Sequence, residues 1–276
     1  MSTIDSSKTP HVLDLAWSCL EGDDPVATLE HLANFTEDEA NGTEIEAIFG
    51  ELILLQVLAL LSLGDLKGAR SALNVADATI ASQPPALQGE WTNDADLVRA
   101  SGEVLLAEWR TEEACDAFAR LLDGADPEEA ASHHERLALC SDLLGDYDAA
   151  DAHLESARGV APLHLSPDEF EAIVGTAAKN LPESFRAKLD TLPVVIDPVP
   201  TRGLMRTGGS PSATPPDLLG LYIEEPPSSI HIFQRNLERV VTSPEELAAE
   251  IEITLYHELA HALGMDEEGV GAIGLA

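Results

Sequence analysis

A helical segment near the end of the sequence contains His257-Glu258-Leu259-Ala260-His261. Two histidines four residues apart lie one above the other on a single helix face, so both imidazoles can bind the same metal ion. Glu258 follows the first histidine directly, which places its carboxylate where it can take a proton from a metal-bound water. The pattern therefore predicts a zinc site held by His257 and His261, with Glu258 as the general base of a hydrolytic reaction.

A third protein ligand is expected, because catalytic zinc usually binds three protein side chains and keeps one position for water. Gly264 comes three residues after His261, where the chain can turn back toward the metal, and three acidic residues follow. The remaining sequence is too short for a glutamate on a separate downstream helix, and the position ten residues after the first histidine is glutamate rather than histidine. We therefore expect Glu267 to be the third ligand, with Glu268 and then Asp266 as the alternatives.

The helix that carries these residues has clear start and stop signals. Ser243-Pro244-Glu245-Glu246 combines a capping serine, a proline at the first helical position and acidic side chains at the positive end of the helix dipole. Gly264 is expected to end the helix.

The segments ahead of this helix predict a small sheet beside helices. Helices are expected at 166–179 and 183–189, strands at 192–197, 218–223 and 230–233, and a long loop at 198–216, which is rich in Pro, Gly, Ser and Thr. The predicted fold class is therefore α+β for this part of the chain. We expect the strand at 229–233 to lie at an edge of the sheet, where an extended peptide can pair with it.

The first 160 residues contain almost no strand signal, and a helical pattern recurs in them. Four turns each follow one helix and open another: Gly22-Asp23, Gly64-Asp65, Trp109-Arg110 and Gly145-Asp146. Five residues after the start of each turn comes an alanine: Ala27, Ala69, Ala114 and Ala150. Nine residues after the start of the last three turns comes a large apolar residue: Leu73, Phe118 and Leu154. The first copy has His31 at this place, with Leu32 beside it. A small residue lets two helices approach, and a large one fills the gap a turn later, so we expect three or four helical hairpins.

Two adjacent histidines in this region, His133 and His134, are expected to be a surface pair. Neighbouring residues point about 100° apart on a helix, so the two rings chelate a metal poorly.

The composition excludes several classes of partner. The 276 residues include 50 acidic and 15 basic side chains, giving a formal net charge of −35, and 45% of the residues are hydrophobic. The chain should therefore fold around a core, while its surface repels nucleic acid and anionic membranes. The longest apolar stretch, 52–63, is too short to span a bilayer, and residues 1–10 show no signal peptide. We expect a cytoplasmic protein with no nucleic-acid or membrane partner.

Two family resemblances follow from these segments. Residues 141–162 are similar to a tetratricopeptide repeat, and residues 166–270 resemble the minimal zincin-like metallopeptidases of bacterial cytoplasmic proteins. The second resemblance rests on several motifs in order: Leu181-Pro182-Glu183, Val194-Val195-Ile196, Leu218-Leu219-Gly220-Leu221-Tyr222, the region 230–238, 243–247 and HELAHALGMDEE. The resemblances imply a tetratricopeptide-like helical solenoid at 1–162 and a zincin domain at 163–276, with a small sheet, an active-site helix and an acidic third zinc ligand.

These observations favour a zinc-dependent peptidase that acts on a peptide or protein, with the helical repeats binding the substrate or a protein partner. Tyr222 and His231 are candidates for stabilising the oxyanion, although a core tyrosine and an outward-facing histidine are the competing interpretations. The alternative function is a non-catalytic interaction scaffold with a zinc-stabilised zincin remnant. The intact Glu258 favours the enzyme, because a purely structural zinc site has no need of a general base.

Overall fold

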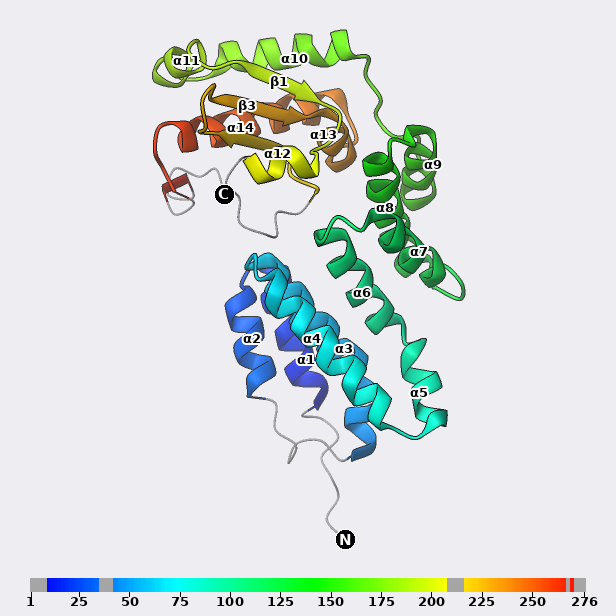
Figure 1. Ribbon diagram of the computed structural model, residues 1–276. Coiled ribbons are helices and arrows are strands. Elements are labelled where there is room, and N and C mark those ends of the chain that lie inside the picture. The colour runs from blue at the N-terminus through cyan, green and yellow to red at the C-terminus, as the bar shows by residue number, and fades with distance from the viewer. Residues whose placement is uncertain (1–8, 35–41, 208–215, 267–268, 271–276) are drawn as a thin grey trace. The chain divides into compact units, whose positions relative to one another are not determined.

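The computed structural model of the chain describes residues 9–34, 42–207, 216–266 and 269–270 (Figure 1). The contacts divide the chain into two compact units, residues 1–126 and 127–276. The predicted domain boundary between residues 162 and 163 remains a prediction. In terms of packing, the helical hairpin just before that boundary belongs to the second unit.

The first unit consists of helices in its described part. They are α1 (Thr9–Glu21), α2 (Pro25–Ala33), α3 (Gly42–Ser62), α4 (Leu66–Ser82), α5 (Pro85–Thr92), α6 (Ala95–Ala107) and α7 (Thr111–Leu121). The pairs α1–α2, α3–α4 and α6–α7 pack as hairpins at the expected places. Ala69, Ala114 and Phe118 are fully buried in them, as the recurring pattern predicts. Helical hairpins are therefore present, and their arrangement as a tetratricopeptide-like solenoid stays a prediction.

The first hairpin begins one residue later than the sequence pattern suggested. Its turn residue with positive φ is Asp23, at 58°, which corresponds to Gly64 and Trp109, at 71° and 62°. Aspartate tolerates this left-handed conformation better than most residues, so no glycine is needed there. Counting from Asp23 puts Thr28 rather than Ala27 at the close helix contact, and Thr28 is the fully buried one.

The second unit starts with a fourth hairpin and continues into a small sheet covered by helices. Its elements are α8 (Pro127–Leu144), α9 (Tyr147–Arg158), α10 (Pro167–Asn180), α11 (Glu183–Leu189), β1 (Val194–Asp197), α12 (Arg202–Thr207), β2 (Gly220–Ile223), β3 (Ser229–Phe233), α13 (Gln234–Val240) and α14 (Pro244–Ala262). The helices α10, α11 and α14 and the three strands agree with the segments predicted from sequence. The predicted loop after β1 contains α12, and its residues 208–215 lie outside the described residues.

The sheet has the order β1-β3-β2, so the expected position of β3 at an edge is wrong. β3 pairs parallel with β1, with His231 opposite Val195, and antiparallel with β2, with Ile230 opposite Tyr222. A strand paired on both sides cannot add a peptide by backbone hydrogen bonding. β2 is therefore the edge strand near the final helix. The chain reaches this order because the long connection after β1 leads to β2, and the short turn after β2 returns β3 to the place beside β1, which strand patterns do not encode.

The core of the second unit lies between one face of the sheet and the helices α10 and α14. Ile230 and Ile232 of β3 pack there with Phe170 of α10 and with Ile251 and Leu255 of α14. Figure 1 shows α14 running behind the strands. This packing fixes the helix that carries the histidine motif against the sheet.

The helices α10 and α14 start at the capping serines that the sequence indicated. The side chain of Ser166 accepts a hydrogen bond from the Glu169 amide in a complete capping box, and Ser243 caps α14 through the Glu246 amide. These caps satisfy amides that have no partner within the helix.

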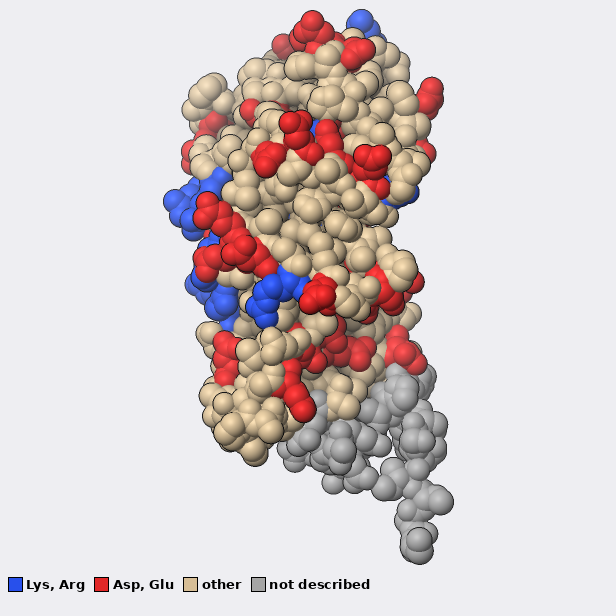
Figure 2. All heavy atoms as spheres, turned by 90° about the vertical axis from the view of Figure 1, so that its right-hand side faces the viewer, with Lys and Arg blue, Asp and Glu red and all other residues tan. Residues whose placement is uncertain are grey.

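The surface agrees with the excess of acidic residues. Figure 2 shows acidic side chains spread over the visible face and far fewer basic ones. Within the described ranges, no helix is long and apolar enough to cross a membrane.

Candidate metal centre and catalytic site

His257 and His261 lie on one face of α14, and their Nε2 atoms lie close together. The two Nε2 atoms are 3.0 Å apart, the ring centroids are 4.7 Å apart, and the ring planes make an angle of 73°. Two nitrogens that each bind one tetrahedral zinc ion at about 2.0–2.1 Å lie about 3.3 Å from each other. The donor atoms are therefore placed to share a metal ion.

A second histidine pair in the same unit has a different geometry. His134 of α8 and His153 of α9 bring their Nδ1 atoms to the same separation, 3.0 Å, but their ring centroids are 5.2 Å apart. At equal nitrogen separation, the larger centroid distance means that these two nitrogens point at each other, as in a hydrogen bond between two rings. At the same nitrogen separation, the shorter centroid distance of 4.7 Å shows that the His257 and His261 rings are bent further away from the line that joins their nitrogens.

The adjacent histidines 133 and 134 do not form the surface pair expected from sequence. His133 is buried and His134 is half-buried against His153. Burial, together with the neighbouring His134, lowers the pKa of His153 below its usual value, so the neutral form that makes a ring-to-ring hydrogen bond is favoured.

The turn after α14 orients the second histidine. Gly264 has a φ of +89°, which favours glycine, and the chain folds back so that the Met265 carbonyl lies 3.0 Å from Nδ1 of His261. A proton on Nδ1 donated to that carbonyl would leave the lone pair of the ring on Nε2, the nitrogen that a metal ion would bind, and this arrangement is common around metal-ligating histidines.

The predicted third ligand lies mostly beyond what the structure describes. Glu267 and Glu268 are outside the described residues, and both stay predictions. Asp266 is exposed, and its Oδ1 accepts a hydrogen bond from the Gly269 amide 3.0 Å away. Among the residues with described positions, no three histidine, cysteine or acidic side chains gather around one point.

The carboxylate of Glu258 is held by the edge strand. Its Oε2 accepts a hydrogen bond of 2.6 Å from the backbone amide of Tyr222 in β2, and only 7% of the residue is exposed. This amide points away from β3, so the outer edge of β2 faces the helix that carries the metal motif. A backbone donor to a buried carboxylate fixes its position and stabilises its charge.

Gly220 allows this close approach of strand and helix. A Cβ atom at this position would lie 2.6 Å from Cγ2 of Thr254 and 3.0 Å from Cγ of Glu258. Both contacts are with α14, so a side chain here would push the strand away from the helix. Sequence reasoning did not single out Gly220, although a glycine inside a strand pattern often marks such a contact.

The two residues proposed from sequence for oxyanion stabilisation have other contacts. Tyr222 lies opposite Ile230, and its side chain packs against the core, so the main-chain amide of this residue is what reaches the site. His231 is hydrogen-bonded through Nδ1 to Asp197 at 2.8 Å and through Nε2 to Ser229 at 3.1 Å. Both nitrogens of His231 are thus engaged within the sheet.

The fold and the paired histidines define the class of protein that this part of the chain resembles. Residues 189–275, less than half of the chain, match the family model described as Zincin-like metallopeptidase. The match includes all three strands and α14, and therefore His257, Glu258 and His261. It supports a zinc peptidase, since proteins of this kind generally bind zinc. No curated protein gives a significant match to the chain.

Proposed function

We propose that the protein is a zinc-dependent peptidase in which His257 and His261 hold the metal and Glu258 is the general base. The convergence of the two Nε2 atoms, 3.0 Å apart, next to a buried carboxylate is the observation that carries this proposal. Glu267 is the proposed third ligand, with Glu268 and Asp266 as alternatives. These donors fit zinc, which binds imidazole and carboxylate groups.

In the proposed reaction, Glu258 transfers a proton and the Tyr222 amide holds its carboxylate. When bound, zinc supplies an acidified water as nucleophile and polarises the peptide carbonyl. Glu258 takes a proton on its carboxylate and passes it to the leaving amine. The Tyr222 amide keeps the carboxylate in place during both transfers. The outer edge of β2, which faces Glu258, is the proposed place for an extended substrate to lie.

Metal content per chain tests the first part of the proposal. The parent protein, purified without added metal, is expected to contain about one zinc ion, whereas His261→Ala should contain little, because one imidazole ligand is lost. The matched control is His134→Ala, which removes one histidine of the His134–His153 pair and should leave the zinc content unchanged. If zinc is absent from the parent and is not taken up on addition, the peptidase proposal is wrong, and a non-catalytic interaction scaffold becomes the better description.

The helical repeats are proposed to bind the substrate or a protein partner. A cavity of about 430 Å³ between α4, α5, α6 and α7 supports this role. Its walls include the apolar side chains of Trp91, Leu97 and Val98, and the charged Asp77 and Arg120. The rest of the lining is partly polar, with Gln88, Thr92 and Ser101, and a pocket that combines apolar walls with a few polar groups is typical of a ligand site.

Removing the first compact unit tests this role. A protein lacking residues 1–126 is expected to cut a different set of peptides from a library than the full chain does, because the cavity is gone. The control is its zinc content, which should equal that of the full chain. Identical cleavage profiles would show that the repeats do not select the substrate.

A further inference from the structure

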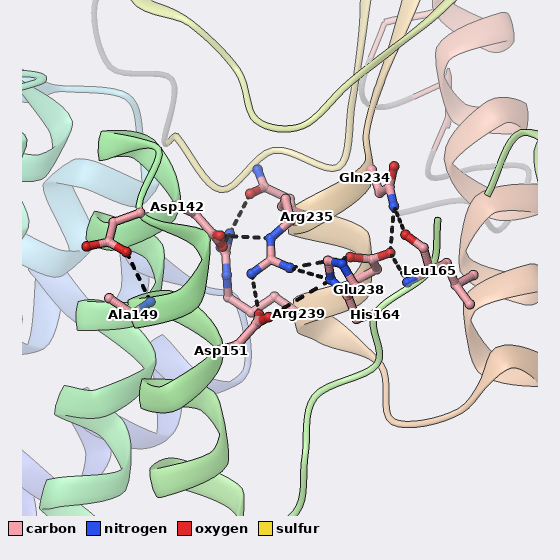
Figure 3. Close-up of polar contacts among 11 residues, drawn as sticks. Asp142, Ala149, Asp151, His164, Leu165, Gln234, Arg235, Glu238 and Arg239 are labelled. Atoms are coloured by element: carbon pink, nitrogen blue, oxygen red, sulfur yellow. Dashed lines mark hydrogen bonds and ion pairs between the residues drawn. The ribbon is translucent and has the colours of Figure 1, made fainter. Parts of the chain in front are cut away.

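A buried polar cluster connects the α8–α9 hairpin to α13, outside the site itself (Figure 3). Asp142 of α8 accepts hydrogen bonds from two arginines of α13, from Nε of Arg235 at 2.8 Å and from a terminal nitrogen of Arg239 at 3.0 Å. Its carboxylate is completely buried, and both guanidinium groups are nearly so. Arg235 also binds Asp151 of α9. Buried charges of this kind persist only when they are paired.

One branch of this cluster reaches the strand that holds Glu258. The terminal nitrogen of Arg239 that binds Asp142 also donates to Oδ1 of Asn236, 2.7 Å away. Asn236 is fully buried, and its Nδ2 donates to the carbonyls of Leu218 and Pro216, at 2.6 Å and 3.0 Å. These two carbonyls belong to the segment that leads directly into β2.

A second contact joins α8 to the same segment. Arg136 of α8 lies 3.6 Å from Asp217, the residue between the two carbonyls that Asn236 binds. The segment 216–218 is therefore attached to α8 twice, once at the surface and once through the buried cluster. Two residues further along the chain Gly220 meets α14, and two residues after that the Tyr222 amide binds Glu258.

We propose that Asp142 and Asn236 are positioning residues that set the Glu258 carboxylate by holding the start of β2 in place. This inference rests on the role proposed for Glu258. Asp142 lies outside residues 189–275, the segment that matches the metallopeptidase family, so part of the support for the site comes from the helical hairpin. The position of β2 follows that of α8, because the carbonyls of Pro216 and Leu218 have a fixed donor only while Arg239 keeps Asn236 in its rotamer.

Hydrogen exchange of the Tyr222 amide, measured on the full chain, tests the proposal without any substrate. Asp142→Asn and Asn236→Ala are each expected to raise its exchange rate at least about tenfold, because the strand moves away from Glu258. The Ile230 amide, which donates to the Pro193 carbonyl on the β1 side, is the internal reference and should change far less. Asp151→Asn is the matched control: it also removes a carboxylate from Arg235 but leaves Asp142, Arg239 and Asn236 intact.

The outcomes separate positioning from general destabilisation. The proposal is overturned if the Tyr222 rate is unchanged in Asp142→Asn and Asn236→Ala, or if it rises no more than the Ile230 rate. It is also overturned if Asp151→Asn has the same effect on Tyr222. Should the buried variants fail to fold, Asp217→Asn removes only the surface contact with Arg136. It should still raise the Tyr222 rate two- to threefold over that of Ile230, and equal rates would contradict the proposal.

Cleavage measurements distinguish this inference from the proposed function. With a peptide identified by library screening, Asp142→Asn should lower kcat while zinc content and KM stay near those of the parent. If the exchange results are as expected but Glu258→Gln cleaves normally, the positioning of the carboxylate holds and its catalytic role fails. If Glu258→Gln is inactive but Tyr222 exchange is unaffected by the cluster variants, the catalytic role holds and the positioning fails.

Discussion

Glu258→Gln is expected to reduce peptide cleavage by at least about 100-fold, because general acid–base catalysis contributes about 10²–10⁴-fold to such reactions. The amide oxygen of glutamine can still accept the hydrogen bond from Tyr222, so the side chain keeps its place but cannot take a proton. Zinc content should remain that of the parent, because the proposed ligands are untouched. The measurement is kcat on a peptide found by library screening, together with metal analysis of the same sample.

A matched control for this variant lies on the same helix. Glu252→Gln makes the same change of charge six residues earlier, where the carboxylate contacts Asn180 at the surface. It should leave cleavage within about twofold of the parent, since surface substitutions have small effects. Equal activity of Glu258→Gln and the parent would show that Glu258 is not the base.

Gly220→Ala is expected to have the second largest effect. The new Cβ would lie 2.6 Å from Cγ2 of Thr254 and 3.1 Å from Oε1 of Glu258, so β2 and α14 must separate. Overpacking of this kind costs about 1–3 kcal/mol of stability. We expect cleavage to fall by at least about tenfold while zinc stays bound, since a misplacement of about 1 Å at a catalytic group is costly. Thermal unfolding, zinc content and kcat measured together test this expectation.

Two further variants show whether the steric contact is the cause. Gly175→Ala is the control: its Cβ would have open space on α10, so the same substitution should stabilise the protein by about 0.5–1 kcal/mol. Thr254→Ser removes only the methyl group that meets the new Cβ, so Gly220→Ala combined with Thr254→Ser should recover part of the lost activity. A double variant no better than Gly220→Ala alone would mean that the contact with Thr254 is not responsible.

Much of the local structure could be predicted from the sequence because its causes lie within a few residues. The serine caps at 166 and 243, the helix between Ser243 and Gly264, and the facing of His257 and His261 all depend on helix geometry and on backbone amides close in sequence. The turns of the helical hairpins lie at or within one residue of their predicted positions for the same reason. The first turn was placed one residue early because a Gly-Asp pair suggested a glycine turn, whereas Asp23 itself adopts the left-handed conformation.

The tertiary structure alone decided which strand lies beside the helix that carries His257 and His261. The residues of β3 suit a strand at an edge and a strand in the centre of a sheet equally well. Its place between β1 and β2 follows from the long connection that leads from β1 to β2 before β3 begins. The hydrogen bond from the Tyr222 amide to Glu258 involves a backbone atom, and every residue type except proline has one, so no sequence pattern marks it.

The proposed positioning role of Asp142 could not be predicted from the sequence either, because this residue contacts Arg239, which lies 97 positions away in the sequence. An aspartate on a helix reads as a solvated side chain until the fold buries it against two arginines. The candidate metal ligands and the candidate general base could therefore be predicted from the order of residues along one helix. The position of its carboxylate depends on contacts that exist only once distant segments have packed together.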